Sequence, residues 1–209
     1  MLQFLRSNRK PLEAALLIGL VFSILLSLVG FDARCGQIRE NVLRLHVLAN
    51  SDSEADQALK LRVRDSVLAA GAEIFAGAET EEEALAAARE NLDVLQKAAE
   101  AEVARSGYDY PVTVEVGPAR FDTRVYDDFT LPAGEYEAVR VLIGAAAGHN
   151  WWCVMFPAVC LPAAEDQGEF SQVLDDGALE IVEEPAKFTF RFKAVEIYED
   201  IRSALESWF

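Results

Sequence analysis

The feature that most constrains this sequence is a long uncharged apolar run near its N-terminus. Residues 14–30 read AALLIGLVFSILLSLVG, and extending the run to 12–31 adds only one charged side chain, Glu13. Twenty helical residues at about 1.5 Å each span roughly 30 Å, the thickness of a bilayer's hydrocarbon core. Three basic residues lie just before the run, within 6–10, and such clusters stay on the cytoplasmic side. The sequence therefore predicts that the rest of the chain lies across a membrane.

Two interpretations of this segment remain open, a cleaved signal peptide and a retained signal-anchor. A cleaved signal has an apolar region of about 7–15 residues and a small-x-small cleavage site. This run is longer and no A-x-A follows it, which favours the anchor. Arg34 stands where a lipoprotein signal needs a small residue before Cys35. We divide the chain into 1–34, signal peptide or signal-anchor helix, and 35–209, a single extracytoplasmic domain.

The predicted domain is strongly acidic. The whole chain has 19 basic and 35 acidic residues, and segment 1–34 holds four and two of them. From residue 35 onward 15 basic and 33 acidic residues remain, a net charge of −18. Such a surface repels phosphate backbones and anionic headgroups and favours solubility. We therefore expect no nucleic-acid partner.

Hydrophobic periodicity divides this domain into strands and helices. Alternation at period 2 predicts strands, and apolar residues three and four apart predict helices. The predicted strands are 41–50, 112–116 with its partner 121–126, 135–144, 152–159 and 188–192. The predicted helices are 54–75, 80–105 and 194–208, and the acidic stretch 163–186 is predicted to be a loop or peripheral hairpin. This order predicts an α+β fold: a mostly antiparallel sheet with two long helices packed on one face, plus the N-terminal hydrophobic helix.

Polar residues mark where the two long helices begin. Ser53 or Asp52 is the expected N-cap of the first helix. Thr80 and Glu83 form a capping-box pattern before the second. The charged side chains of the first helix are expected to face solvent: Lys60, Arg62, Arg64 and Asp65.

The three cysteines allow more than one chemistry. An exported domain lies where disulfides persist, and Cys153 and Cys160 are spaced to close a small loop. We predict this disulfide, with two reduced core cysteines and a catalytic thiol as alternatives. Cys35 is left over, either free or linking two chains.

Catalytic and metal motifs are missing from the sequence. It contains no HExxH, CxxC, GxSxG or phosphate-binding glycine loop. A thiol hydrolase would have to pair Cys153 with His149 or His46, and neither pairing forms a recognised pattern. We predict no catalytic residue, no metal site and no cofactor, with an exported cysteine-dependent cell-wall or peptide hydrolase as the alternative.

Two polar clusters are candidate contact sites. The first, LHVLANSDSEAD, places a polar turn between a strand and a helix, although such residues also serve only to cap and turn. The second, GHNWW, carries adjacent tryptophans that must point to opposite faces of a strand. One exposed tryptophan is typical of an interface hot spot, and the alternative is a tryptophan covered by the acidic loop.

Four segments together resemble a known family. They are IRENVLRLHVLANSDSEADQALKLRVRDSVL, YPVTVEVG, TLPAGEYEAVRVLIG and GHNWWCVMFPAVCL, and they cover most of 38–161. In this order they resemble stage II sporulation protein R, with RLHVLANSDS and NWWCVMFP the most distinctive blocks. The stretch 163–186 and the C-terminal helix match less clearly.

The resemblance implies a secreted signalling protein of endospore-forming bacteria. Such a protein is exported across the forespore membrane into the intermembrane space, where it triggers a membrane-embedded aspartic protease that processes pro-sigma-E. The expected partner is the extracytoplasmic face of that protease, with the membrane as a second contact through 12–31 if this segment is uncleaved. We expect the partner to contact Asn50, Asp52, Asn150, Trp151 and Trp152.

Overall fold

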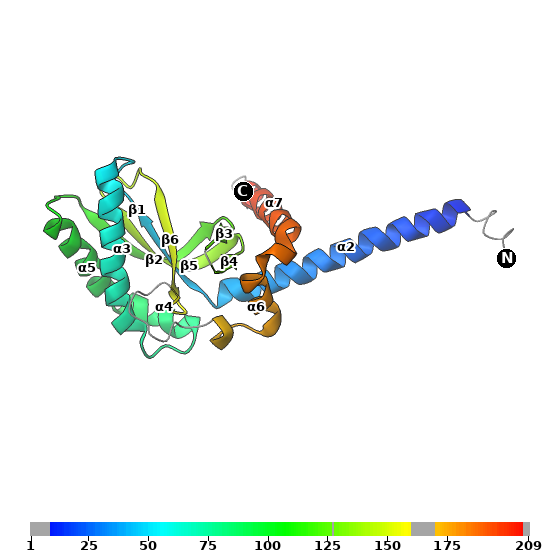
Figure 1. The fold of residues 1–209 in the computed structure, drawn as a ribbon, viewed down its shortest axis with the longest axis horizontal. Helices are drawn as coiled ribbons and strands as arrows, with labels where there is room; N and C mark the ends of the chain where they lie inside the picture. The colour runs from blue at the N-terminus through cyan, green and yellow to red at the C-terminus, as the bar shows by residue number, and fades with distance from the viewer. Residues whose placement is uncertain (1–8, 127, 160–169, 207–209) are drawn as a thin grey trace.

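The computed structural model describes residues 9–126, 128–159 and 170–206. Its centre is a four-stranded sheet in the order β2-β5-β1-β6 (Figure 1). The strands are β1 Leu43–Leu48, β2 Val112–Phe121, β5 Gly134–Ile143 and β6 Asn150–Phe156. β1 runs parallel to β5 and antiparallel to β6, and β2 runs antiparallel to β5. The predicted α+β fold with a mostly antiparallel sheet is confirmed.

Three helices cover one face of the sheet. They are α3 Glu54–Phe75, α4 Glu81–Glu90 and α5 Leu92–Arg105. The start of α3 is confirmed, because the hydroxyl of Ser53 accepts the Asp56 N–H at 3.1 Å. Thr80 caps α4 as predicted, but the single helix expected over 80–105 ends at Asn91 and restarts as α5. The backbone of Asn91 leaves helical geometry there, with φ −108° and ψ 23°.

The core under these helices follows the predicted pattern. β1 contributes Leu45 and Val47, which are fully buried. Leu59, Val63 and Val67 of α3 pack in the same cluster, as their spacing of four residues predicts. The side of β1 that faces these helices is apolar and packs against them.

A second layer covers the opposite face. It consists of the end of α2 Arg9–Glu40, α6 Asp176–Glu183 and α7 Thr189–Glu206, with short 3-10 turns η1 Phe170–Gln172 and η2 Pro185–Phe188. A separate small hairpin pairs β3 Arg124–Val125 with β4 Thr130–Leu131. Both faces of the sheet are thus buried, which explains why β1 is apolar or buried at nearly every position.

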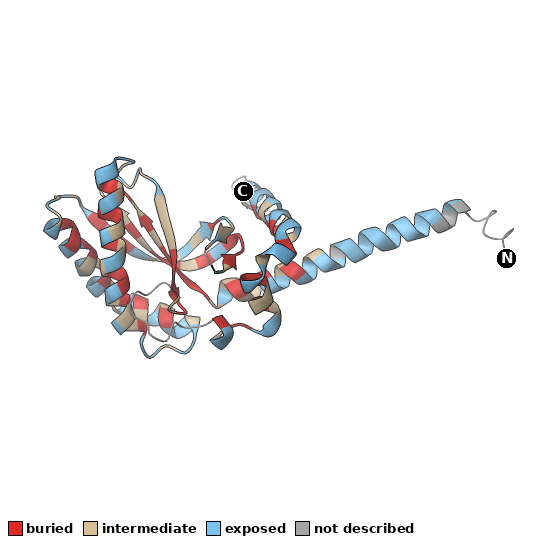
Figure 2. Cartoon of the chain, viewed as in Figure 1, coloured by how far each residue is buried: buried red, intermediate tan, exposed pale blue. Residues whose placement is uncertain are grey.

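Helix α2 is continuous from the apolar run into the domain, across the predicted boundary at 34/35. Its part from Glu13 contains one stretch apolar enough to cross a membrane, with mean hydropathy 2.6. Figure 2 shows that the free half of α2 is exposed along its length. At the other end Phe31, Cys35 and Ile38 are buried in the second core, and the ring of Phe31 lies 5.5 Å from that of Phe188. The last turns of α2 are therefore part of the domain.

The predicted strand 188–192 is wrong. Phe188 and Phe192 are buried while Phe190 is 93% exposed, and Phe188, Phe192, Val195 and Glu199 repeat at helical rather than strand spacing. α7 therefore begins at Thr189 and includes most of the helix predicted for 194–208. Within the predicted acidic loop 163–186, residues 176–183 form α6, capped by Asp175, and 163–169 lie outside the described residues.

The predicted partner strand 121–126 is also wrong. β2 continues to Phe121, and its partner along its whole length is β5. β2 is an edge strand, so Pro118, which has no N–H to donate, is tolerated opposite Glu137. Only Arg124–Val125 of the predicted segment is extended, and it pairs with β4.

The burial of Phe31 gives a test of whether the end of α2 stabilises the domain. We expect Phe31→Ala to lower the free energy of unfolding by about 3 kcal/mol, since it empties a packed aromatic site. Val29→Ala, at a position 68% exposed on the same helix, is the matched control and should change little. Urea unfolding of the detergent-solubilised chain measures both, and equal midpoints would contradict the assignment.

Candidate functional site

One end of the sheet brings the two predicted polar clusters together. The turn 50–53 follows β1, and residues 144–149 join β5 to β6. Because β1 and β5 are parallel and β6 is antiparallel to both, the end of β1, the end of β5 and the start of β6 meet at one edge. We call residues 50–53 together with 145–151 the strand-end surface.

Asn50 ties the two loops to each other. Its Oδ1 accepts the Ala145 N–H at 2.9 Å, and its Nδ2 donates to Asp56 Oδ2 at 2.9 Å. Gly144 has φ +59°, and a Cβ there would lie only 2.2 Å from Asn50 Oδ1. The glycine thus supplies both a backbone conformation and the space that the amide needs. Asn50, predicted to contact a partner, has its side chain committed to holding the loops.

Asp56 is the buried centre of this network. It is 4% exposed and accepts hydrogen bonds from the hydroxyl of Ser51, at 2.5 Å, and from Asn50. These bonds favour the ionised carboxylate and lower the pKa of Asp56, the Ser51 bond most and the Asn50 bond next. A single carboxylate therefore fixes the turn against the first turn of α3.

Lys60 holds the opposite loop to α3. It is 4% exposed, and its ammonium donates to the carbonyl of His149 at 3.0 Å and to Gln57 Oε1 at 2.6 Å. Gln57 in turn donates to the Ser51 carbonyl at 2.9 Å. Burial lowers the pKa of Lys60. The prediction that this side chain faces solvent is wrong, because it lies under the β5–β6 loop.

Asp52 and His149 are two accessible polar groups of the strand-end surface. The Asp52 side chain is 56% exposed and that of His149 79% exposed. The backbone N–H of His149 donates to Asp52 Oδ1 at 2.6 Å, and the His149 ring nitrogen Nδ1 contacts the same oxygen. These two hydrogen bonds lower the pKa of Asp52. An ionised carboxylate beside an imidazole is thus presented to solvent on a fixed backbone.

The adjacent tryptophans point to opposite faces, as the strand alternation predicts. Trp151 lies on the α3 side, with the guanidinium of Arg64 4.4 Å from its ring. Trp152 lies on the other side, stacked on His46 at 5.7 Å and covered by Arg124 at 3.4 Å. Both side chains are partly buried, so the structure shows neither the one exposed tryptophan that was expected nor a fully covered one.

The five residues predicted to contact a partner therefore divide between two faces. Asn50 and Asp52 lie beside Trp151 at the strand-end surface. Asn150 shares a face with Trp152, and its side chain hydrogen-bonds His46. Their role in binding stays a prediction.

Sequence reasoning missed the charged flank of α3 that supports this surface. Asp56, Lys60 and Arg64 recur every four residues, so they form one stripe along the helix. That spacing was visible in the sequence. Its meaning was hidden because the loop that covers Lys60 comes from about ninety residues later in the chain.

The geometry does not assemble the alternative thiol site. Cys153 is buried and disulfide-bonded, so its sulfur is not a free nucleophile. Cys153 pairs with Leu45, and His46 therefore lies on the opposite face of the sheet. Cys160 lies outside the described residues, so its predicted bond to Cys153 stays a prediction. Cys35 is free and fully buried. Among the described residues, no three His, Cys, Asp or Glu side chains are grouped to hold a metal.

Comparison with known proteins agrees with the resemblance noted in the sequence. The family described as stage II sporulation protein R matches residues 39–166. Stage II sporulation protein R of Bacillus subtilis (strain 168) is 36% identical over 123 residues, which is 59% of this chain and 55% of that protein. The alignment thus spans about half of the curated relative. No solved structure matches the chain.

Removal of the Asp56 carboxylate tests the network. We expect Asp56→Ala to lower the free energy of unfolding by about 2 kcal/mol, because Asn50 and Ser51 lose their acceptor. Asp56→Asn keeps an acceptor oxygen without the charge and should cost less. Since the folded pKa is lowered, the charge stabilises fully above the ordinary Asp pKa of about 4, and this stabilisation is lost progressively as pH falls from there through the lowered folded pKa. Chemical denaturation from pH 7 to pH 3 should show the wild-type and Asn variants converging; a constant difference would contradict this.

The close approach of the two loops gives a second prediction. A Cβ at Gly148 would lie 2.2 Å from the Ser51 carbonyl oxygen, a backbone atom that cannot move aside alone. We expect Gly148→Ala to destabilise by more than about 1 kcal/mol and to shift the amide NMR signals of Ala145 and His149. Gly117→Ala, where nothing lies within 4 Å of the new Cβ, is the control. Unchanged amide signals in Gly148→Ala would refute the contact.

Proposed function

The chain belongs to the stage II sporulation protein R family, and from this premise we propose that it is an exported, non-enzymatic signal of sporulation. It crosses the forespore membrane and binds the extracytoplasmic face of a membrane-embedded aspartic protease. That protease then processes the pro-sigma-E factor. The observation that carries the proposal is that the two most distinctive family blocks, far apart in sequence, pair as the neighbouring strands β1 and β6, whose ends meet at the strand-end surface.

The N-terminal segment supports export. An exposed apolar helix follows a basic tip and enters the second core only at Phe31. Figure 1 shows the strand-end surface, at the start of α3, on the side of the domain away from the free half of α2. A chain held by α2 would therefore present this surface away from its own membrane, toward an opposite one.

The strand-end surface is held in one conformation, which suits binding to a partner. Four backbone or side-chain donors from 145–149 are bound to acceptors in residues 49–52. Binding through a preformed surface avoids the entropic cost of ordering a loop. To activate its partner, the surface has to bind the active conformation more tightly than the inactive one.

Two groups of this surface fit partner recognition. Trp151 offers an aromatic ring that lies 4.4 Å from the guanidinium of Arg64, and part of the side chain remains accessible. Asp52 offers an exposed carboxylate whose lowered pKa keeps it ionised at neutral pH. Trp151 and Asp52 together fit a partner surface that has a basic group for the carboxylate and an apolar pocket for the ring.

Single substitutions test the surface. We expect Asp52→Ala and Trp151→Ala each to reduce processing of the sigma-factor precursor severalfold, in sporulating cells or with the reconstituted protease. Asp93→Ala removes another exposed aspartate, paired with Lys97 on α5, and should leave processing unchanged. Precursor and product are measured by immunoblot, with the level of each variant checked in the same samples.

Two outcomes would contradict the proposed contact surface or the proposed non-enzymatic role. Normal processing in both variants at normal protein levels would show that the strand-end surface is not the contact. Full activity of the purified protein on a cell-wall or peptide substrate, lost in Cys153→Ser but kept in Cys160→Ser, would favour the hydrolase instead.

A further inference from the structure

Helix α7 has a second apolar face that nothing in the described residues covers. Phe190, Ile197, Ile201 and Leu205 are 93%, 52%, 56% and 58% exposed, and their spacing of seven, four and four residues places them on one side of the helix. The opposite side carries Phe192 and Val195, which are buried in the second core. A helix of a water-soluble domain exposes a polar face, so this stripe requires an apolar neighbour.

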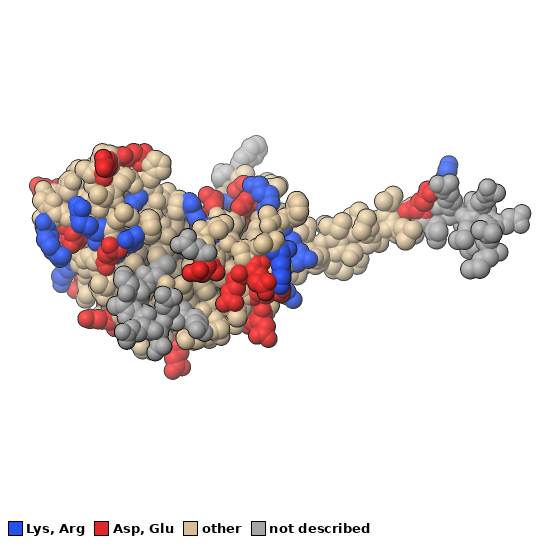
Figure 3. Space-filling model, viewed as in Figure 1, with Lys and Arg blue, Asp and Glu red and all other residues tan. Residues whose placement is uncertain are grey.

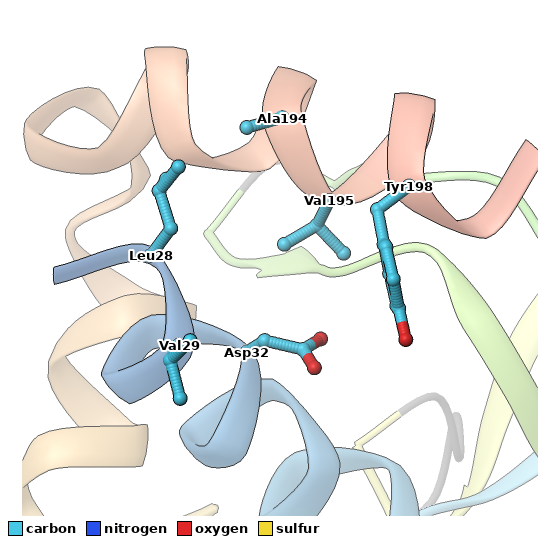
Figure 4. Close-up of a pocket in the computed structure, with 6 residues that line it drawn as sticks. All are labelled: Leu28, Val29, Asp32, Ala194, Val195 and Tyr198. Carbon is cyan, nitrogen blue, oxygen red and sulfur yellow. The ribbon is translucent and has the colours of Figure 1, made fainter. Parts of the chain in front are cut away.

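The stripe lies where the apolar run of α2 ends. Arg191 of α7 donates to the hydroxyl of Ser27 at 3.0 Å, within the last turn of the uncharged run. A hollow of about 270 Å³ separates the two helices there, lined by Leu28, Val29, Asp32, Ala194, Val195 and Tyr198 (Figure 4). If the run 12–31 spans the hydrocarbon, this crossing lies at the level where α2 leaves it.

The direction of α7 is also suited to a position at the surface of the membrane. Figure 1 shows α7 rising steeply away from α2, on the side of the domain that faces the free half of α2. With α2 along the membrane normal, α7 would run close to the membrane plane. Apolar helices in this position bury one face at the boundary between headgroups and acyl chains.

We propose that α7 is a membrane-interface helix. With α2 retained as a transmembrane anchor, the stripe of Phe190, Ile197, Ile201 and Leu205 inserts into the outer leaflet of the same bilayer. This rests on the proposed export through α2 and adds that the domain has a fixed orientation on the membrane.

The charge distribution indicates insertion by apolar area rather than by attraction to anionic lipid. α7 carries three basic and four acidic residues, which nearly cancel. Figure 3 shows side chains of both signs at the junction and an uncharged stretch of α2 beyond it. Insertion should therefore be insensitive to salt, unlike binding through a basic patch.

The test compares neighbouring positions on α7 in the full chain. Ile201→Cys lies on the stripe, and Asp200→Cys lies beside it, where the carboxylate is 74% exposed. The chain is reconstituted in vesicles of phosphatidylethanolamine and phosphatidylglycerol and treated with a water-soluble maleimide. The unsubstituted chain, in which Cys35 is fully buried, gives the background.

We expect Ile201→Cys to react at least severalfold more slowly than Asp200→Cys, at low and high salt alike. Both should react equally once the vesicles are dissolved and the chain is unfolded. Equal reaction rates of the two variants in vesicles would overturn the proposal. Protection of Ile201→Cys that disappears as the protein is diluted in lipid would also overturn it, because a second copy of the chain would then be covering the stripe.

Flotation of the same vesicles separates this inference from the proposed export. A chain that floats but shows equal rates keeps α2 as an anchor and removes α7 from the membrane. A chain that does not float overturns both the anchor and the interface helix.

Discussion

Strand β1 is buried on both faces and hydrogen-bonded along both edges, and the other elements take their positions from it. Leu45 and Val47 join it to the helices α3–α5. On the other face the fully buried guanidinium of Arg44 lies 4.0 Å from the ring of Phe121 and 5.0 Å from that of Tyr136, and donates to the hydroxyl of Tyr126 at 2.7 Å. A buried cation is costly unless aromatic faces and an acceptor stabilise it. β1 thereby holds β2, β5 and the β3–β4 hairpin in one arrangement.

The same strand determines where the candidate surface forms. Its parallel pairing with β5 and antiparallel pairing with β6 bring three strand ends to one edge. Asp56 and Lys60, two buried charges of opposite sign, then fix the loops by hydrogen bonds to Ser51, Asn50 and the His149 carbonyl. The accessible part of this edge includes the Asp52–His149 pair and part of the Trp151 side chain. The strand-end surface is therefore fixed by the fold itself.

The continuity of α2 links this surface to the apolar run. Because Phe31, Cys35 and Ile38 are core residues, the helix that leaves the domain cannot pivot freely where it emerges. Arg39 strengthens this join, since it donates to the Ala133 carbonyl at 3.0 Å and lies 3.8 Å from the buried carboxylate of Glu199. The apolar run and the strand-end surface are thus related by a stiff connection rather than by a linker.

The sequence by itself determined the elements whose signal is local. The apolar run, the start of α3 at Ser53, the cap at Thr80 and the alternation of β5 follow from neighbouring residues and stand in the structure. The sequence also brought out both polar clusters and the opposite directions of Trp151 and Trp152. The family resemblance rested on these same local blocks.

Only the tertiary structure decided what depends on distant segments. Phe188 to Phe192 alternate like a strand, yet the end of α2 offers a surface that a helix fits, so packing overrides the local pattern. The helical pattern predicts that Lys60 faces solvent, but in the structure the loop before β6 covers it. The two clusters became one surface because β1, β5 and β6 pair across about ninety residues of sequence, and no local period records which strands will be neighbours.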